Sequence, residues 1–131
     1  MSKKVLLDTT VLIDVLHRRP EMLATLKTLV RDDFELATSA INVAEIYAGV
    51  RPGEESSTDA LVGSLACFDL NRELAQQAGA LVTARRQVGR TDSLDDMIIA
   101  ATAIRHDCLL FTGNRKDFEV PGIHFYPPEV E

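Results

Sequence analysis

Four acidic residues of this chain could together hold a metal ion, provided that the fold brings them to one place. They are Asp8, Glu45, Asp96 and Asp117. Carboxylates held within ~4–6 Å of one another repel, and each raises the pKa of its neighbours. A divalent cation removes that penalty, and ligation by oxygen atoms alone favours Mg²⁺ or Mn²⁺. Such an ion would neutralise phosphate charge and lower the pKa of a bound water.

Histidine and cysteine offer no competing metal site in the sequence. His17, His106 and His124 are scattered along the chain, and the two cysteines lie far apart, so zinc-ligand spacing is absent. Cys67 and Cys108 each lie in a short apolar run. This pattern predicts two buried thiols rather than a disulfide or a metal pair.

Alternating strands and helices are the elements that must position the acids, and the sequence predicts such an alternation. Apolar runs predict strands at 5–7, 34–38, 67–70 and 108–111, with a fifth at 124–126. Helical spacing predicts helices at 11–16, 21–30, 40–50, 57–66, 72–88 and 94–106. The capping residues expected to begin them include Thr9 or Thr10, Ser39, Asn71 and Ser93. The 131 residues therefore predict a single α/β domain (1–131) with a roughly five-stranded parallel sheet covered on both faces.

All four acids are predicted at one edge of this sheet, outside the carboxyl ends of the strands, where ligands of open α/β sheets bind. Each also has a simpler explanation. Asp8 could cap a helix, and Asp96 could form a capping box with Ser93. Glu45 could pair with an arginine, and Asp117 could lie in a solvated charged loop. The other acids near this edge are interpreted as surface or capping residues: Asp14, Asp92 and Asp95.

The predicted helix that carries Glu45 is apolar on two faces. Small residues share the face of Glu45, and larger apolar residues occupy the opposite face: Val43, Ile46, Tyr47 and Val50. A carboxylate in these surroundings is costly unless it is paired or bound to metal. One sheet can cover only one face of the helix, so we expect the other face to form a homodimer interface.

The charge balance does not by itself indicate a nucleic-acid-binding protein. Fourteen Lys and Arg against twenty Asp and Glu give a net charge of −6, whereas such proteins usually carry a basic excess. A bound cation or local basic patches would be needed; the candidate phosphate contacts are Arg18, Arg19, Arg51, Arg85, Arg86, Arg90, Arg115 and Lys116. No uncharged stretch is longer than 74–84, which is too short to cross a bilayer. We therefore expect no membrane association and a cytoplasmic location.

Four segments form an ordered set of motifs: LDTTVLID at 7–14, TSAINVAEI at 38–46, DMIIAATA at 96–103 and FTGNRKDF at 111–118. Together they resemble the motifs of PIN-domain nucleases, and more narrowly those of VapC-type toxins from prokaryotic type II toxin–antitoxin pairs. The resemblance spans residues 5 to about 126. It implies a PIN-like three-layer α/β/α sandwich and a metal-dependent endoribonuclease that a small cognate antitoxin inhibits.

The resemblance also implies roles for individual residues. The acidic quartet Asp8, Glu45, Asp96 and Asp117 would bind Mg²⁺ or Mn²⁺, with Asp8 and Asp96 as the most direct ligands. The residues expected to orient the acids or a water are Thr9, Ser39, Thr112 and Asn114. The substrate would be RNA. Because the site concentrates negative charge, the inhibitor should offer an arginine together with an apolar segment.

Two other functions remain open on the sequence alone. A receiver-like signalling domain could use Asp8 for Mg²⁺, Asp69 as the phosphoacceptor and Lys116 as the cation. The first strand, however, lacks the paired acids usual in receivers, and Asp69 lacks a following Met-Pro turn. A catalytically inactive RNA- or protein-binding module is the third reading, and the intact acids in all four motifs weigh against it.

Overall fold

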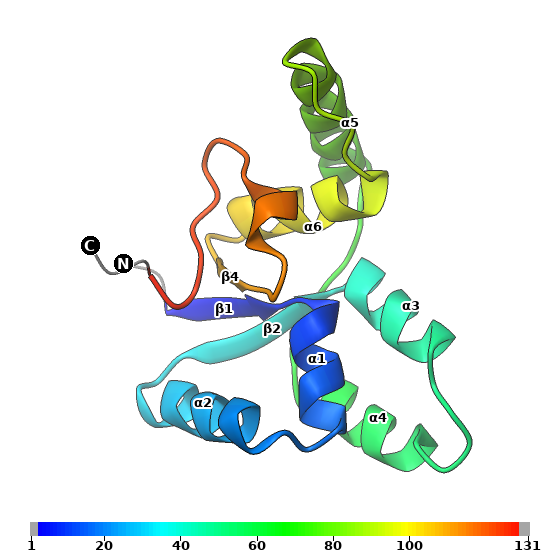
Figure 1. The fold of residues 1–131 in the computed structure, drawn as a ribbon, viewed down its shortest axis with the longest axis vertical. Helices are drawn as coiled ribbons and strands as arrows, with labels where there is room; N and C mark the ends of the chain where they lie inside the picture. Colours follow the sequence, from blue (N-terminus) through cyan, green and yellow to red (C-terminus); the bar gives the residue numbers. More distant parts are fainter. Residues whose placement is uncertain (1–2, 129–131) are drawn as a thin grey trace.

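Four parallel strands form the central sheet of the computed structural model, which describes residues 3–128. β1 (Lys4–Leu7) lies between β2 (Glu35–Ser39) and β4 (Leu109–Phe111), and β3 (Ala66–Phe68) pairs with the outer side of β2. Figure 1 shows β1 and β2 crossing the middle of the molecule. Because every pair is parallel, the carboxyl ends of all strands meet at one edge.

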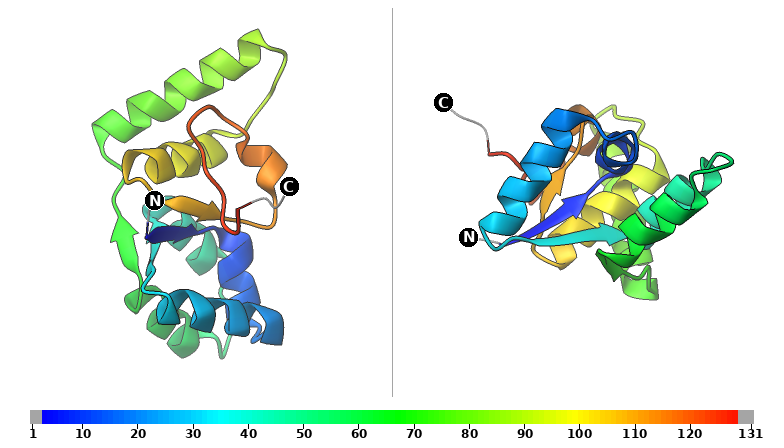
Figure 2. Two further views of the ribbon diagram at one scale, coloured as in Figure 1. Left: turned by 90° about the vertical axis from the view of Figure 1, so that its left-hand side faces the viewer. Right: turned by 90° about the horizontal axis from the view of Figure 1, so that it is seen from below.

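Helices cover both faces of the sheet, which confirms the three-layer α/β/α sandwich (Figure 2). One layer contains α1 (Thr9–Leu16), α2 (Pro20–Arg31) and α4 (Glu55–Gly63), and the other contains α5 (Arg72–Gln87) and α6 (Leu94–Arg105). α3 (Ala40–Ala48) lies next to α1 and α6, and the short 3-10 turn η1 (Arg115–Phe118) follows β4.

Side chains that alternate along β1 separate the core into two clusters. Val5 and Leu7 pack with Leu12 of α1 in one cluster, whereas Leu6 packs with Met97 of α6 in the other. All five side chains are buried. This alternation is the period of a β-strand, and it explains why so short a strand can hold both helical layers.

Local capping chemistry begins three of the helices as predicted. Ser39, Asn71 and Ser93 are the N-caps of α3, α5 and α6, and their side-chain oxygens accept backbone N–H groups at 3.2, 2.8 and 3.1 Å. α5 ends where Gly89 adopts a φ of +83°, a conformation that glycine adopts readily. Other element boundaries differ from the predicted ones by a few residues.

The fifth strand was predicted wrongly, and 124–126 makes only one isolated parallel bridge, between Phe125 and Leu110. Leu110 N–H donates to His124 O at 2.8 Å, and Tyr126 N–H donates to Leu110 O at 2.9 Å. Pro127 follows directly and has no N–H with which to continue the ladder. The sheet therefore stops at four strands.

Two further predictions need correction. α1 begins after Asp8, which is its N-cap, and not after Thr9 or Thr10. Cys67 is exposed because β3 is an edge strand, whereas Cys108 is buried as predicted, and burial raises the pKa of its thiol to about 11. Within residues 3–128, no helix is long and apolar enough to cross a membrane.

Candidate active site at the carboxyl edge of the sheet

Asp8 is the most buried of the four predicted acids, with 5% of its surface exposed. Its backbone N–H donates to Phe111 O at 3.0 Å. Its Oδ1 accepts a hydrogen bond from Asn42 Nδ2 at 3.0 Å, and its Oδ2 accepts from Thr112 Oγ1 at 2.7 Å and from Thr10 Oγ1 at 3.5 Å. The side chain makes no capping bond to α1. These donors fix the carboxylate, which still has lone pairs available for another ligand.

Asn42 is the functional residue that the sequence reasoning missed. It is fully buried in the first turn of α3. Ser39 Oγ donates to its Oδ1 at 2.6 Å, and its Nδ2 donates to Asp8 Oδ1 and to Thr9 Oγ1, both at 3.0 Å. Ser39 thus acts on Asp8 through Asn42. An amide in the first turn of a largely apolar helix, three residues after its cap, was the available signal.

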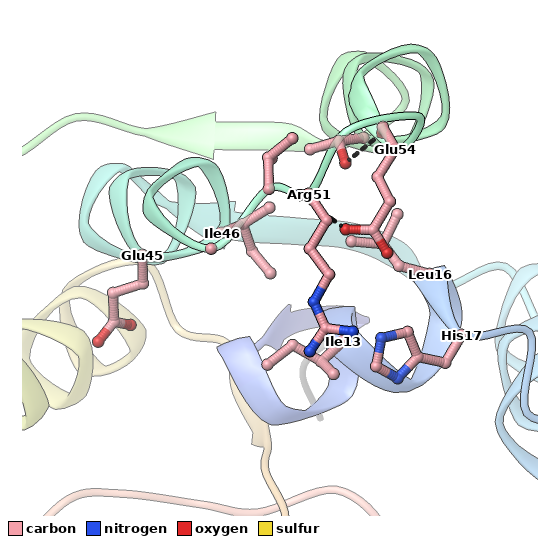
Figure 3. A pocket seen from close by; sticks show the side chains of 10 residues that line it. Ile13, Leu16, His17, Glu45, Ile46, Arg51 and Glu54 are labelled. Atoms are coloured by element: carbon pink, nitrogen blue, oxygen red, sulfur yellow. Dashed lines mark hydrogen bonds between the residues drawn. The ribbon is translucent and has the colours of Figure 1, made fainter.

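Glu45 lies on the exposed side of α3 and accepts a 2.6 Å hydrogen bond from Thr9 Oγ1 at its Oε1. The helix pattern predicted that this carboxylate would lie among apolar residues. That prediction was wrong, because the structure places Glu45 at an exposed position. Figure 3 shows Glu45 extending from α3 well apart from Arg51. Among the ion pairs of residues 3–128, none involves Glu45, so the alternative of an arginine salt bridge finds no support.

The negative charges of the other three acids affect the pKa of Asp96. It lies in the first turn of α6, and its backbone N–H donates to the capping Ser93 Oγ at 3.1 Å. Burial raises the pKa of the Asp96 carboxyl, the hydrogen bond with Ser93 opposes the rise, and the charges of Asp117, Asp8 and Glu45 add to it. The capping role and a shared acidic site are therefore both present.

Asp117 reaches this edge on η1, on the exposed side of the turn. The segment before it is fixed to Asp8 through Thr112, whose buried Oγ1 also accepts Asn114 N–H at 3.0 Å. Gly113 N–H donates to Thr10 Oγ1 at 2.9 Å. Asn114 contributes its backbone, and its side chain makes no capping bond to η1.

The donor set matches a hard divalent cation in its chemistry. It consists of carboxylates and neutral oxygens, which Mg²⁺ and Mn²⁺ prefer. Within the described part of the chain, no three such acidic, histidine or cysteine side chains stand close enough together to hold an ion. The acids thus share one electrostatic neighbourhood, in a more open arrangement than a coordination shell.

The structure separates the residues of the phosphoacceptor alternative. Asp69 follows the edge strand β3, and β2 lies between β3 and the strand that precedes Asp8. Lys116 belongs to η1, which follows β4 on the other side of β1. Neighbouring strands are ~4.8 Å apart, so Asp69 and Lys116 lie on opposite sides of Asp8. This arrangement disfavours the signalling function.

Arg85 and Asp92 occupy different positions from those predicted. Arg85, expected as a phosphate contact, is buried, and Asp92, expected at the surface, has only 6% of its side chain exposed because the two form an ion pair. Asp14 does lie in a surface ion pair, with Arg19 at 3.0 Å.

Comparison with known proteins agrees with the motifs. The model of the PIN domain family matches residues 5–122. Ribonuclease VapC19 of Mycobacterium tuberculosis is 32% identical over 113 residues, which cover 86% of this chain and 90% of that protein. The crystal structure of VapBC2 from Rickettsia felis bound to a DNA fragment from their promoter superposes with a TM-score of 0.82 at 26% identity, covering 93% of this chain and 96% of that one. A toxin-antitoxin complex from Klebsiella pneumoniae gives a TM-score of 0.76 at 28% identity, covering 96% and 99%. The chain, as its four motifs predict, belongs to the PIN-domain family.

Proposed function

We propose that this chain is a Mg²⁺- or Mn²⁺-dependent endoribonuclease that acts as the toxin of a toxin–antitoxin pair. One observation carries the proposal: Asp8, Glu45 and Asp117 all raise the pKa of Asp96 through their charges, although the four acids come from four separate segments. Four carboxylates gathered without a cation partner disfavour the metal-free state. The ribonuclease named as a 32% identical relative supports the choice of RNA as substrate.

Asp8 and Asp96 would hold the ion most directly, with Glu45 and Asp117 completing the site. The ion would lower the pKa of an attacking water and neutralise charge on the phosphodiester. Asp8 is already fixed by Asn42 and Thr112. Glu45 and Asp117 are exposed, so their side chains can rotate inward at little cost and complete the coordination.

The inhibitory partner would dock across the helical layer next to the acids. A groove there is lined by the apolar Ile13, Leu16 and Ile46 of α1 and α3, and Glu45 lies at one end of it (Figure 3). The charged side chains of Arg51 and Glu54 also line this groove. An apolar helix or strand fits such a groove, and an arginine beyond its end would pair with the acids bidentately. The relatives whose structures are toxin–antitoxin complexes support an antitoxin as this partner.

The decisive experiment measures cleavage of total cellular RNA by the purified chain with Mg²⁺, with Mn²⁺ and with EDTA. We expect cleavage with either ion and none with EDTA. Asp96→Asn should abolish it, whereas the matched control Asp95→Asn, which removes the exposed neighbouring carboxylate, should cleave at the wild-type rate. Full activity in EDTA would overturn the metal mechanism. Stable phosphorylation of an aspartate by acetyl phosphate would instead support the signalling function.

A further inference from the structure

An ion-pair network centred on Asp92 joins two of the segments that carry the acids. The Asp92 carboxylate accepts from Arg85 Nε at Oδ2 and from Arg85 Nη2 at Oδ1, the latter at 3.2 Å. Only 10% of the Arg85 side chain and 6% of the Asp92 side chain are exposed. Arg90 Nη2 lies 3.6 Å from Asp92 Oδ1. One carboxylate therefore holds two arginines in place.

Both arginines also donate to backbone carbonyls on either side of Asp117. Arg85 Nη1 donates to Glu119 O, and Arg90 Nη2 donates to Lys116 O at 3.1 Å. Hydrogen bonds from charged donors are stronger than neutral ones. The backbone of η1 is thus held on both sides of the residue that carries the fourth acid.

The other end of the network lies close to Asp96 in the sequence. Asp92 immediately precedes Ser93, the N-cap of α6, and Asp96 lies in the first turn of that helix. In Figure 1, α5 projects beyond the sheet and its chain returns to α6 through this segment. The network therefore connects the start of α6 with the turn that carries Asp117.

Within η1 itself, the first and last residues hold the turn: Arg115 Nη2 donates to Pro127 O, and the Arg115 guanidinium lies over the Phe125 ring at 5.1 Å. η1 is a single 3-10 turn of four residues, in which Asp117 N–H donates to Asn114 O at 3.0 Å. Phe118 anchors it through a buried ring. A buried ring fixes where the turn lies but leaves the turn able to rotate about that ring. Hydrogen bonds are directional, so the two arginine bonds fix the orientation of the turn.

We propose that Asp92, Arg85 and Arg90 are positioning residues that set the place of Asp117 relative to Asp96. This inference rests on the proposed function, because the distance between these two acids matters for holding a metal ion. None of the three side chains needs to touch the ion or the RNA. Partners that orient metal ligands in this way commonly change metal affinity by ~10–100-fold when removed.

The test combines amide hydrogen exchange of η1, followed by NMR, with Mn²⁺ binding, followed by calorimetry, on the full chain. Asp92→Asn removes the central charge. Arg90→Gln is the milder variant, since Arg90 is 45% exposed and its loss leaves the Arg85–Asp92 pair intact. We expect faster exchange of the Asp117 amide in both, and Mn²⁺ affinity ~10–100-fold weaker in Asp92→Asn with a smaller loss in Arg90→Gln.

Two controls distinguish positioning from general stability. Arg105→Lys disturbs an ion pair between α5 and α6, that of Arg105 with Glu73, at a site away from η1. Val82→Ala loosens the packing of α5 against the core. Both should keep wild-type exchange at Asp117 and wild-type Mn²⁺ affinity, even where the thermal midpoint falls.

Wild-type exchange and affinity in both network variants would overturn the positioning role, as would an equal loss in Val82→Ala. If the wild-type chain binds no Mn²⁺, the proposed function fails, and the exchange of the Asp117 amide still decides whether the network orients η1. The two failures are thereby distinguishable.

Discussion

Thr112 donates a 2.7 Å hydrogen bond to the carboxylate of Asp8 across 104 positions of sequence. The same oxygen accepts Asn114 N–H, so one hydroxyl joins the end of β1 to the segment after β4. Both Thr112 and Asp8 are buried. The parallel pairing of β1 with β4 makes this contact possible, because it brings the two strand ends to one edge.

Replacing this hydroxyl by a methyl group should weaken both the fold and the site. Thr112→Val keeps the shape of the side chain but leaves the buried Asp8 Oδ2 with only the 3.5 Å contact from Thr10 Oγ1, at a cost of about 1–3 kcal/mol in the free energy of unfolding. Urea denaturation would measure that cost, and RNA cleavage should slow by about tenfold. Thr102→Val is the matched control, because the buried Thr102 hydroxyl donates to Ile98 O within α6, away from the acids. Equal cleavage by the two variants would contradict an orienting role for Thr112.

Asn42→Ala should be among the more damaging changes near the site. It removes a fully buried amide that bonds to Asp8, Thr9 and Ser39, and it leaves a cavity. We expect a loss of about 2–4 kcal/mol in the free energy of unfolding and a loss of cleavage. Asn71→Ala, which removes the capping amide of α5, should cost about 1 kcal/mol and leave cleavage unchanged. Similar stability losses in both variants would show that Asn42 is only a cap-region residue.

Much of the site was predictable from local patterns, and the rest depends on contacts between distant segments. Ser39 and Ser93 cap helices because the bond closes within three residues, so the sequence contains the whole interaction. Asn42 donates to Asp8, which lies 34 positions away, and Arg85 donates to Glu119 O just after η1, also 34 positions away. Periodicity carries no information about such pairs. The bridge at Phe125 shows the same limit, since an apolar run predicts a strand but not where its ladder stops.

Asp96→Asn should stabilise the metal-free protein in a pH-dependent way. Burial and the neighbouring acids raise the pKa of Asp96 in the folded state above its value in the unfolded chain. The folded state therefore carries a penalty that is absent below the unfolded pKa of about 4, grows between the unfolded and the folded pKa, and is complete above the folded pKa. The thermal midpoint of the variant in EDTA should exceed that of the wild type at pH 7 and approach it at about pH 3. A lower midpoint at pH 7 would identify Asp96 as a structural residue.

The second apolar face of α3 leads us to expect a homodimer. Ile46 is buried in the core, whereas Ala44, Tyr47 and Ala48 are exposed on the same helix. Light scattering at micromolar concentration should give about twice the chain mass of 14.4 kDa. Ala48→Glu places a charge on this face and should shift the protein to the monomer, whereas Ala60→Glu on the exposed side of α4 should not. A wild-type mass equal to one chain would refute the dimer.

The last prediction concerns control of the activity by an inhibitor in the groove beside Glu45. Ile13 lines this groove and is 40% exposed, so Ile13→Glu should disturb docking without disturbing the fold. The partner to test is any small protein whose reading frame lies directly beside that of this chain, and co-expression with it should rescue growth that the chain alone arrests. Its affinity should fall by at least ~tenfold in Ile13→Glu, as expected for an apolar anchor at an interface. Ile104→Glu, which places the same charge at an exposed apolar position of α6, should bind normally.

Neutralising Glu45 and Asp96 together should also weaken binding of the inhibitor, because the arginine of the partner would lose both carboxylates. If the chain expressed alone is harmless and cleaves no cellular RNA with Mg²⁺ present, both this control and the toxin function fail.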